Sequence, residues 1–307
     1  MAAAVEGKGL WVWYASQIVG VYGTVEKAVD AAVKAGFSHI LVKVANGWYP
    51  WLPGTYEGRY LLDLMKEAHR RGMKVHAWRY TFAFNSVSRE IDACRRAWEA
   101  YGDLCSSWTE DAEAEYKVST GAAHADALLP EVKKIVAPVP LGFTSYRYPD
   151  LHNSFPWEAF ARHCDFTIPQ VYWIQAHNPG AQIDESLRQY QARSYLKKFT
   201  PFPVAGSTYQ AGTWKPTTSD LNEFSDRAQE RGIPAINWWR WDTLVNLGLW
   251  ETAAAQEWPV AGAPVPVPVP VPVTKHWSEL TAAQKDSVVL RTAQQAGVAD
   301  EDGFVVV

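Results

Sequence analysis

The sequence predicts an α/β protein in which eight strand–helix units form a (β/α)8 barrel. Short apolar runs alternate with amphipathic segments between residues 10 and 249, and such alternation implies a parallel sheet. Eight units in roughly 250 residues match the size of a (β/α)8 barrel. A doubly wound sheet is the alternative, but the sequence lacks the glycine-rich phosphate turn that usually accompanies that fold.

The first half of the barrel is expected to contain four strands, each followed by a helix. Apolar or β-branched runs predict strands at 10–15, 38–44 and 74–82, and an acidic stretch at 108–116 supplies the fourth. The helices are expected at 25–35, 56–71, 86–101 and 121–136. Thr24 is expected to cap the first helix, and Gly36, Gly72 and Gly102 to end the first three.

The second half follows the same pattern with shorter elements. Strands are expected at 141–147, 166–173, 202–210 and 235–241. Helices are expected at 157–162 and 184–199, and a further helix is expected to run to Arg231 and stop at Gly232. Either Thr218 or Ser219 is the expected cap of that last helix.

The composition changes abruptly after Trp258, which predicts three segments: a barrel at 1–258, a linker at 259–274 and a short helical attachment segment at 275–307. A strict Pro-Val alternation through Val273 predicts a stiff polyproline II spacer. Residues 277–296 read as one amphipathic helix. The segment is too short to bury a core alone. We therefore expect it to dock on the barrel, mediate self-association or attach the chain to a larger assembly.

Charge and composition narrow the choice of partners. The chain has 307 residues and a formal net charge of −4 without a basic stripe, which argues against nucleic acid. No apolar run approaches the roughly 20 residues of a membrane helix. The first residues lack the pattern of a secretory signal, so we expect synthesis in the cytoplasm. Three scattered cysteines, Cys94, Cys105 and Cys164, fit a reduced chain better than a disulfide frame.

The stretch from Trp108 to Tyr116 carries the strongest chemical signal. Asp111, Glu113 and Glu115 alternate with alanines, so on a strand they would share one face. Mutual repulsion should raise the pKa of at least one of them. A protonated acid beside an ionised carboxylate is what glycoside hydrolysis needs. The alternative is a solvated acidic turn at the start of a helix, where carboxylates favour the positive end of the dipole.

Polar and aromatic residues near the other strand ends are the candidates for substrate binding, because barrel active sites lie at the C-terminal ends of the strands. The 16 tryptophans suit a cleft that stacks sugar rings. Individually, Lys43 could be a satisfied core residue, Arg147 could pair with a structural acid, and most tryptophans could be packing. No cofactor is implied, and no histidine stands at metal-ligand spacing from the acids. The substrate-binding candidates are Lys43, Trp78, Tyr80, Arg147, Gln170, Tyr172, His177, Trp239, Trp241 and Asp242.

Asp111-Ala112-Glu113 at the end of the fourth strand resembles the Asp-x-Glu signature of the glycoside hydrolase family 25 lysozymes. Chitinase-type family 18 barrels carry a related acidic motif, and a tyrosine on strand six, where Tyr172 is expected. The resemblance covers the barrel and departs from family 25 at the end of strand one, where that family has an aspartate. This place holds Trp11, Trp13 or Tyr14 here. Residues 145–149, 169–173 and 237–242 are similar to barrel hydrolases of bacteria and phages.

The resemblance implies hydrolysis of peptidoglycan or a related polysaccharide. Glu113 is the expected general acid. Asp111 is expected to stay ionised and either orient an acetamido group or stabilise the transition state. Glu115 is a further carboxylate candidate, and Gln170 and Tyr172 are expected to bind the sugar. A phage endolysin or virion-carried lysin acting at the bacterial cell wall fits this reading. The alternative is a non-catalytic barrel that binds carbohydrate or serves a phage tail.

Overall fold

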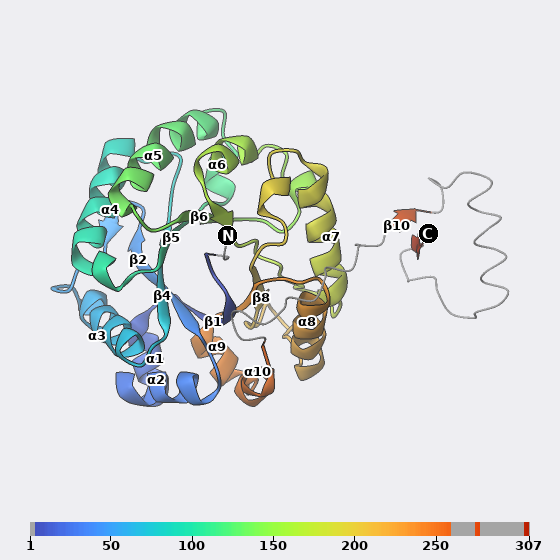
Figure 1. Cartoon of the computed structure of the whole chain (residues 1–307), viewed down its shortest axis with the longest axis horizontal. Coiled ribbons are helices and arrows are strands. Elements are labelled where there is room, and N and C mark those ends of the chain that lie inside the picture. The colour runs from blue at the N-terminus through green and yellow to red at the C-terminus, as the bar shows by residue number, and fades with distance from the viewer. Residues whose placement is uncertain (1–3, 259–273, 277–303, 307) are drawn as a thin grey trace. The chain divides into compact units, whose positions relative to one another are not determined.

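The computed structural model describes residues 4–258, 274–276 and 304–306. In the first of these ranges, eight parallel strands curl into a barrel with helices around it (Figure 1), which confirms the predicted fold class. The parallel strands are β1 (Gly7–Val12), β2 (His39–Asn46), β4 (Lys74–Tyr80), β5 (Ser107–Asp111), β6 (Leu141–Thr144), β7 (Phe166–Thr167), β8 (Val204–Ser207) and β9 (Ala235–Trp239).

Helices follow most strands and pack outside the barrel (Figure 1). The α-helices are α1 (Ala15–Tyr22), α2 (Val25–Lys34), α3 (Tyr56–Arg70), α4 (Val87–Tyr101), α5 (Gly121–Val136), α6 (Trp157–His163), α7 (Pro179–Ala192), α8 (Thr218–Glu230), α9 (Trp241–Asn246) and α10 (Trp250–Ala255). Short 3-10 helices are η1 (Gly102–Leu104), η2 (Ala114–Tyr116), η3 (Pro149–Leu151) and η4 (Lys197–Phe199). The side chain of Thr24 accepts a hydrogen bond from the Lys27 amide and caps α2, as predicted.

The strands follow the order β7-β6-β5-β4-β2-β1-β9-β8 around the barrel. The segment after β7 closes the ring, because Gln170 and Ala205 form a parallel bridge and the Val171 amide donates to the Ala205 carbonyl at 2.8 Å. A short strand, β3 (Tyr49–Pro50), pairs antiparallel with β2. Closure brings the C-terminal ends of all eight parallel strands to one rim.

The barrel interior contains an apolar cluster and a layer of buried polar side chains, in which His39 Nε2 lies 2.6 Å from Asn237 Oδ1. Large side chains of the strands, among them Trp11, Leu41 and Trp78, form one buried cluster. Val5, which precedes β1, is fully buried in the same cluster. A barrel filled in this way is a packed core and leaves room for a ligand at the C-terminal rim.

A buried ion pair fastens β4 to β5 on the side that faces α4. The Arg79 guanidinium donates from Nη2 and Nε to the Glu110 carboxylate at 2.7 and 3.0 Å. Arg79 also donates to the backbone carbonyl of Glu90, and the Glu90 carboxylate accepts from the Asn85 amide at 2.7 Å. Arg79, Glu90 and Glu110 are completely buried, so this part of the acidic stretch is structural.

Several predicted boundaries are wrong. The fourth strand was expected to reach residue 116 but ends at Asp111. Only Phe166–Thr167 of the expected strand 166–173 forms a ladder. The eighth strand ends at Trp239, and α9 begins at Trp241. In each case the alternating pattern continues in the sequence after the backbone has left the extended conformation.

Helix starts also differ from the expectation. The cap of α8 is Thr217 rather than Thr218 or Ser219, because Thr217 and Asp220 exchange side chain-to-backbone hydrogen bonds in a capping box. Helix α7 begins at Pro179 instead of residue 184, since proline is favoured in the first helical turn.

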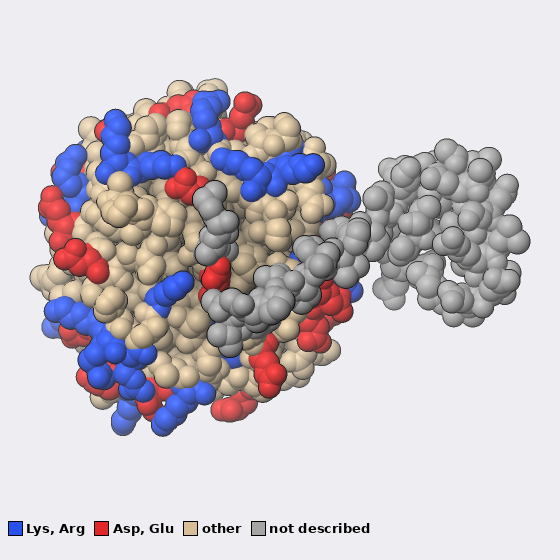
Figure 2. Space-filling model, viewed as in Figure 1, with Lys and Arg blue, Asp and Glu red and all other residues tan. Residues whose placement is uncertain are grey.

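The expected Pro-Val spacer and most of the terminal helical segment, at 259–273 and 277–303, lie outside the described residues. Near the C-terminus, β10 (Thr274–His276) pairs antiparallel with β11 (Phe304–Val306), which was not predicted. Among the described residues, no helix has the length and apolarity to span a bilayer. Cys94, Cys105 and Cys164 are free thiols. On the face shown in Figure 2, basic and acidic side chains are interspersed around the periphery.

Candidate active site

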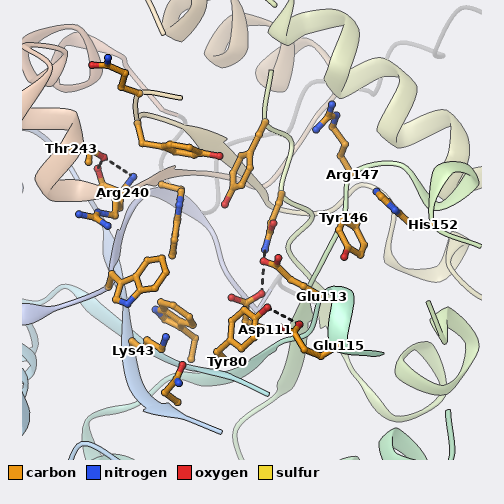
Figure 3. Close-up of a pocket in the computed structure, with 18 of the residues that line it drawn as sticks. Lys43, Tyr80, Asp111, Glu113, Glu115, Tyr146, Arg147, His152, Arg240 and Thr243 are labelled. Atoms are coloured by element: carbon orange, nitrogen blue, oxygen red, sulfur yellow. Dashed lines mark hydrogen bonds between the residues drawn. The ribbon is translucent and has the colours of Figure 1, made fainter. Parts of the chain in front are cut away.

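A cavity of about 1050 Å³ opens at the C-terminal rim of the barrel, where parallel strands of a barrel place their functional side chains. Figure 3 shows acidic, aromatic and basic side chains converging on it from different strand ends. The cavity is lined by Trp13, Lys43, Asn46, Trp78, Tyr80, Phe82, Asp111, Glu113, Glu115, Tyr146, Arg147, Tyr148, Leu151, His152, Gln170, Tyr172, Tyr209, Gln210, Trp239, Arg240, Thr243, Asn246 and Leu247.

The three acids Asp111, Glu113 and Glu115 all line this cavity, but not as one face of a strand. Asp111 is the last residue of β5 and is only 5% exposed. Glu113 follows the strand, and Glu115 lies in η2. The expectation of a continuous strand is corrected here: the chain turns after β5, and the turn brings the two glutamates beside Asp111.

Gln170 links two of these acids. Its Nε2 donates one hydrogen bond to Glu113 Oε1 at 2.8 Å and one to Asp111 Oδ1 at 3.2 Å (Figure 3). Because both carboxylate oxygens bond to the same nitrogen, the two acids are held close together in a fixed geometry. The segment that carries Gln170 is itself fixed, since it forms the bridge that closes the barrel.

The environment raises the pKa of both linked carboxyls. Burial raises the pKa of Asp111 well above its usual range, and the neighbouring charge of Glu113 adds to this effect, while Lys43 opposes it. Burial also raises the pKa of Glu113, opposed by the hydrogen bond from Gln170 and reinforced by Glu115. Asp111 is the more deeply buried of the two, so desolvation acts against its expected ionised form, while Lys43 favours that form. Close carboxyls of this kind titrate as a pair.

Glu115 has a separate partner. The Tyr80 hydroxyl donates to Glu115 Oε2 at 2.8 Å (Figure 3). Burial, with the nearby carboxylates, raises the pKa of Tyr80, so this phenol stays a neutral donor. Tyr80 thus orients Glu115 at the edge of the acidic group.

Indole rings form an aromatic floor under the acids, made by Trp13, Trp78 and Trp239. The Trp13 and Trp239 ring centroids are 5.4 Å apart, and those of Trp78 and Trp239 are 5.6 Å apart. Trp11, deeper in the barrel, supports the floor at 5.4 Å from Trp78. Such a surface suits the apolar face of a sugar ring.

Lys43 projects from β2 over this floor. Its Nζ lies 4.7 Å from the Trp13 ring centroid and 5.0 Å from that of Trp78. Burial lowers the pKa of Lys43 to about 8, although Asp111 and Glu113 act in the opposite direction. At neutral pH Lys43 is therefore mostly a cation beside the acids.

Two tyrosines complete the wall on the β7 and β8 side. Tyr172 and Tyr209 pack edge to face with their ring centroids 5.9 Å apart. Burial, aided by the charges of nearby groups, raises the pKa of Tyr172 well above its usual range. The Tyr172 hydroxyl is thus available as a donor to a sugar oxygen.

We call a group of four residues the cationic corner (Lys117, Tyr146, Arg147 and His152): the last three line the cavity after β6, and Lys117, which follows η2, contacts Tyr146 and His152 from outside the lining. The Tyr146 and His152 rings stack with centroids 3.7 Å apart. The Lys117 ammonium donates to His152 Nδ1 at 2.8 Å, and lies 4.2 Å from the centroid of Tyr146. Burial, then the charges of Lys117 and Arg147, lower the pKa of His152 to about 4, so the ring is neutral at pH 7.

Three of the proposed substrate-binding residues lie outside the cavity lining. Trp241 is buried in α9 and donates to the Tyr22 hydroxyl at 3.1 Å. Asp242 forms a two-pronged ion pair with Arg240 at 2.7 and 2.6 Å. His177 contacts Asp220 Oδ2 at 2.8 Å. The structure does not bring these three residues into the cavity lining: β9 ends before Trp241 and Asp242, and His177 contacts the capping acid of α8.

Other lining residues were missed, notably Tyr209, His152 and Arg240. Of the two neighbours of Tyr209, Gln210 also lines the cavity, whereas Thr208 is fully buried and its Oγ1 donates to the Arg240 carbonyl. Alternation from Ala205, which faces the barrel interior, would have indicated Tyr209. His152 lies in a loop where no periodicity applies.

Across the residues that the structure describes, no group of three or more His, Cys, Asp or Glu side chains is arranged to hold a metal ion. The partners of Asp111, Glu113 and Glu115 are instead the hydrogen-bond donors Gln170 and Tyr80.

Comparison with known proteins gives similarity in fold but not in sequence. No protein-family model matches the chain, and no curated protein matches it. Among solved structures, the glycoside hydrolase domain of PgaB (BpsB) from Bordetella bronchiseptica superposes with a TM-score of 0.58 at 10% identity, covering 81% of this chain and 98% of that one.

Two further solved structures have the same fold. The endo-1,4-beta-mannanase from Rhizomucor miehei has a TM-score of 0.56 at 8% identity, with 76% of this chain and 86% of that one covered. The spore cortex-lytic enzyme SleL from Bacillus megaterium has a TM-score of 0.53 at 9% identity, with 83% and 75% covered. At these identities the similarity establishes the fold alone.

Proposed function

We propose that the protein is a glycoside hydrolase that cleaves a polysaccharide by carboxylate acid/base chemistry. The observation that carries this proposal is the pair of buried carboxyls, Asp111 and Glu113, joined by one nitrogen of Gln170 above the aromatic floor. Glycoside hydrolysis needs one carboxyl that donates a proton and one that stabilises positive charge on the sugar. The solved glycoside hydrolases of the same fold support this choice.

Burial and charge assign a different catalytic role to each of the two carboxyls. Glu113 is the more exposed member of the pair and can reach the glycosidic oxygen of a bound polymer, so it donates the proton. Asp111 lies deeper, with Lys43 favouring its ionised form, and it stabilises the oxocarbenium-like transition state when Glu113 holds the proton. Tyr172 and Gln170 hold the sugar ring, and the floor stacks against it.

Within this class we propose a bacterial cell-wall glycan as the substrate. The similarity in fold to a spore cortex-lytic enzyme supports this choice, as does the Asp-x-Glu spacing of Asp111 and Glu113. A role as a phage endolysin, and attachment through the segment beyond residue 258, belong to the same proposal.

A second candidate is a barrel that binds the glycan without cleaving it. The observation that favours this reading is that β1 ends at Val12 and is followed by Trp13 and Tyr14, so no acid complements the pair from that strand. The two candidates differ in whether new reducing ends form.

Release of reducing ends from purified peptidoglycan, chitin and mannan by the full chain tests the proposal. We expect cleavage of at least one polymer by the wild type and its loss in Glu113→Gln, about 10²–10⁴-fold slower. Glu158→Gln, on the exposed surface of α6, is the matched control and should keep the wild-type rate. Binding of a glycan without any reducing ends would favour the second candidate, and a fully active Glu113→Gln variant would contradict the proposal.

A further inference from the structure

The cavity is divided by charge. Its acids lie near the C-terminal end of β5, while Tyr146, Arg147 and His152 of the cationic corner line the wall formed after β6 (Figure 3). Lys43 lies across the acids from Arg147, enclosed by aromatic rings. A neutral polysaccharide could be bound by the aromatic surfaces and hydroxyl groups of the wall alone. The cations of the cationic corner therefore indicate a charged ligand group.

Arg147 is a cation of the cavity that has no acidic partner among the described residues. Within 4–258, no carboxylate lies at ion-pairing distance from it, whereas Arg240 in the same cavity is paired with Asp242. The neighbour of its guanidinium is the Tyr148 ring, 4.8 Å from the centroid. The Tyr148 phenol is a hydrogen-bond partner of the guanidinium, and Nε is buried without a partner, so the remaining terminal N–H groups are the donors that Arg147 can offer to a ligand.

Lys117 and His152, the other polar members of the cationic corner, add a positive charge and hydrogen-bond donors. Lys117 places a second cation against the Tyr146–His152 stack. Since His152 Nδ1 accepts a hydrogen bond from the Lys117 ammonium, the neutral ring carries its own proton on Nε2, and His152 lines the cavity. The nearest carboxylate by sequence, Asp150, pairs instead with Arg193 at 2.7 Å. The corner therefore offers a planar guanidinium and nearby donors to an oxyanion.

We infer that the cationic corner is a subsite for a carboxylate-bearing sugar of the polymer, with Arg147 as the residue that determines this specificity. The inference rests on the proposed function of the same cavity. A guanidinium binds a carboxylate through two parallel hydrogen bonds, a geometry that hydroxyl groups do not match. The substrate class is accordingly an acidic polysaccharide whose carboxylated unit lies beside the unit held by Asp111 and Glu113.

Calorimetric binding to the full-length Glu113→Gln protein tests this inference without relying on turnover. The probes are oligogalacturonate, hyaluronan fragments and peptide-free peptidoglycan strands, each compared with its carboxyl-reduced counterpart. We expect at least one carboxylated probe to bind about tenfold or more tightly than its reduced form, since hydrogen bonds to charged groups contribute about 1.5–3 kcal/mol. Adding Arg147→Gln should abolish this preference and leave the affinity for the reduced form unchanged.

Arg59→Gln is the matched control, because Arg59 also lies over tyrosine rings, 4.9 Å from the Tyr56 centroid, but outside the cavity. It should keep the preference. Equal binding of carboxylated and reduced probes, or a preference that survives Arg147→Gln, would overturn the inference. Glu113-dependent cleavage of a neutral polymer would then still support the proposed function, whereas failure to bind any probe in either form, with no cleavage by the wild type, would contradict both.

Discussion

Lys43 links the aromatic floor to the charge state of the acids. Its ammonium favours the ionised forms of Asp111 and Glu113 and so lowers their pKa values, against the larger effect of burial. Aromatic rings surround it, and within the described chain its amine makes no ion pair at contact distance. The same cation can therefore act on both acids without neutralising either of them.

Replacing Lys43 by methionine should move the acidic limb of the pH profile of kcat/KM to higher pH, by roughly half a unit or more. The sign follows from the removal of a cation, which raises the carboxyl pKa values further, so ionisation of one member of the pair needs a higher pH. Lys27→Met, at an exposed position of α2, should leave the profile unchanged. An unmoved acidic limb in Lys43→Met would show that Lys43 does not act on the reacting carboxyl.

At the scale of elements, the Arg79–Glu110 pair connects β4, β5 and α4. Arg79→Leu should lower the free energy of unfolding by about 3–5 kcal/mol, because it leaves the buried Glu110 carboxylate without a counter-charge. Urea unfolding followed by circular dichroism measures this loss. Arg95→Leu on α4 removes an exposed pair with Asp92, and should cost less than about 1 kcal/mol. Equal stability of the two variants would contradict the role of the pair.

The strands and the acidic group could be predicted because burial and alternation leave a pattern in the sequence. The ends of the strands could not be predicted, because side chains alternate between the two faces only while the backbone is extended. This is why Asp111 was placed correctly on a strand and Glu115 was not, and why Trp241 was assigned to the cavity although it begins α9. His152 enters from a loop whose path depends on tertiary packing.

Hydrogen bonds and ion pairs between residues that are far apart in the sequence could not be predicted from the sequence either. Gln170 was proposed to bind sugar, but its two hydrogen bonds to the acids depend on the closure of the ring between β7 and β8. Similarly, Asp242 and His177 were proposed to bind substrate, and only the folded chain supplies Arg240 and Asp220 as their partners.

At the scale of the whole molecule, residues 4–258 contain a complete barrel with its own core. The last turns contribute to it, since Trp258 Nε1 donates to the Pro234 carbonyl at 3.3 Å and Gln256 Nε2 to the Leu221 carbonyl at 2.8 Å. A chain truncated after Trp258 should therefore melt within a few degrees of the full chain and keep any hydrolytic activity. If light scattering shows that the truncated chain no longer self-associates, this loss would fit the expected role of residues 259–307 in self-association or attachment. Melting far below the full chain would show that those residues stabilise the barrel.

Whether Asp111 and Glu113 act as one catalytic pair is tested most directly by the turnover numbers of Asp111→Asn, Glu113→Gln and the double variant on a polymer that the wild type cleaves. We predict that each single change lowers kcat by about 10²–10⁴-fold. The double variant should be little slower than the slower single variant, because groups that act as a unit are not additive. Wild-type turnover in either single variant, or a double loss equal to the product of the two single losses, would contradict the paired mechanism.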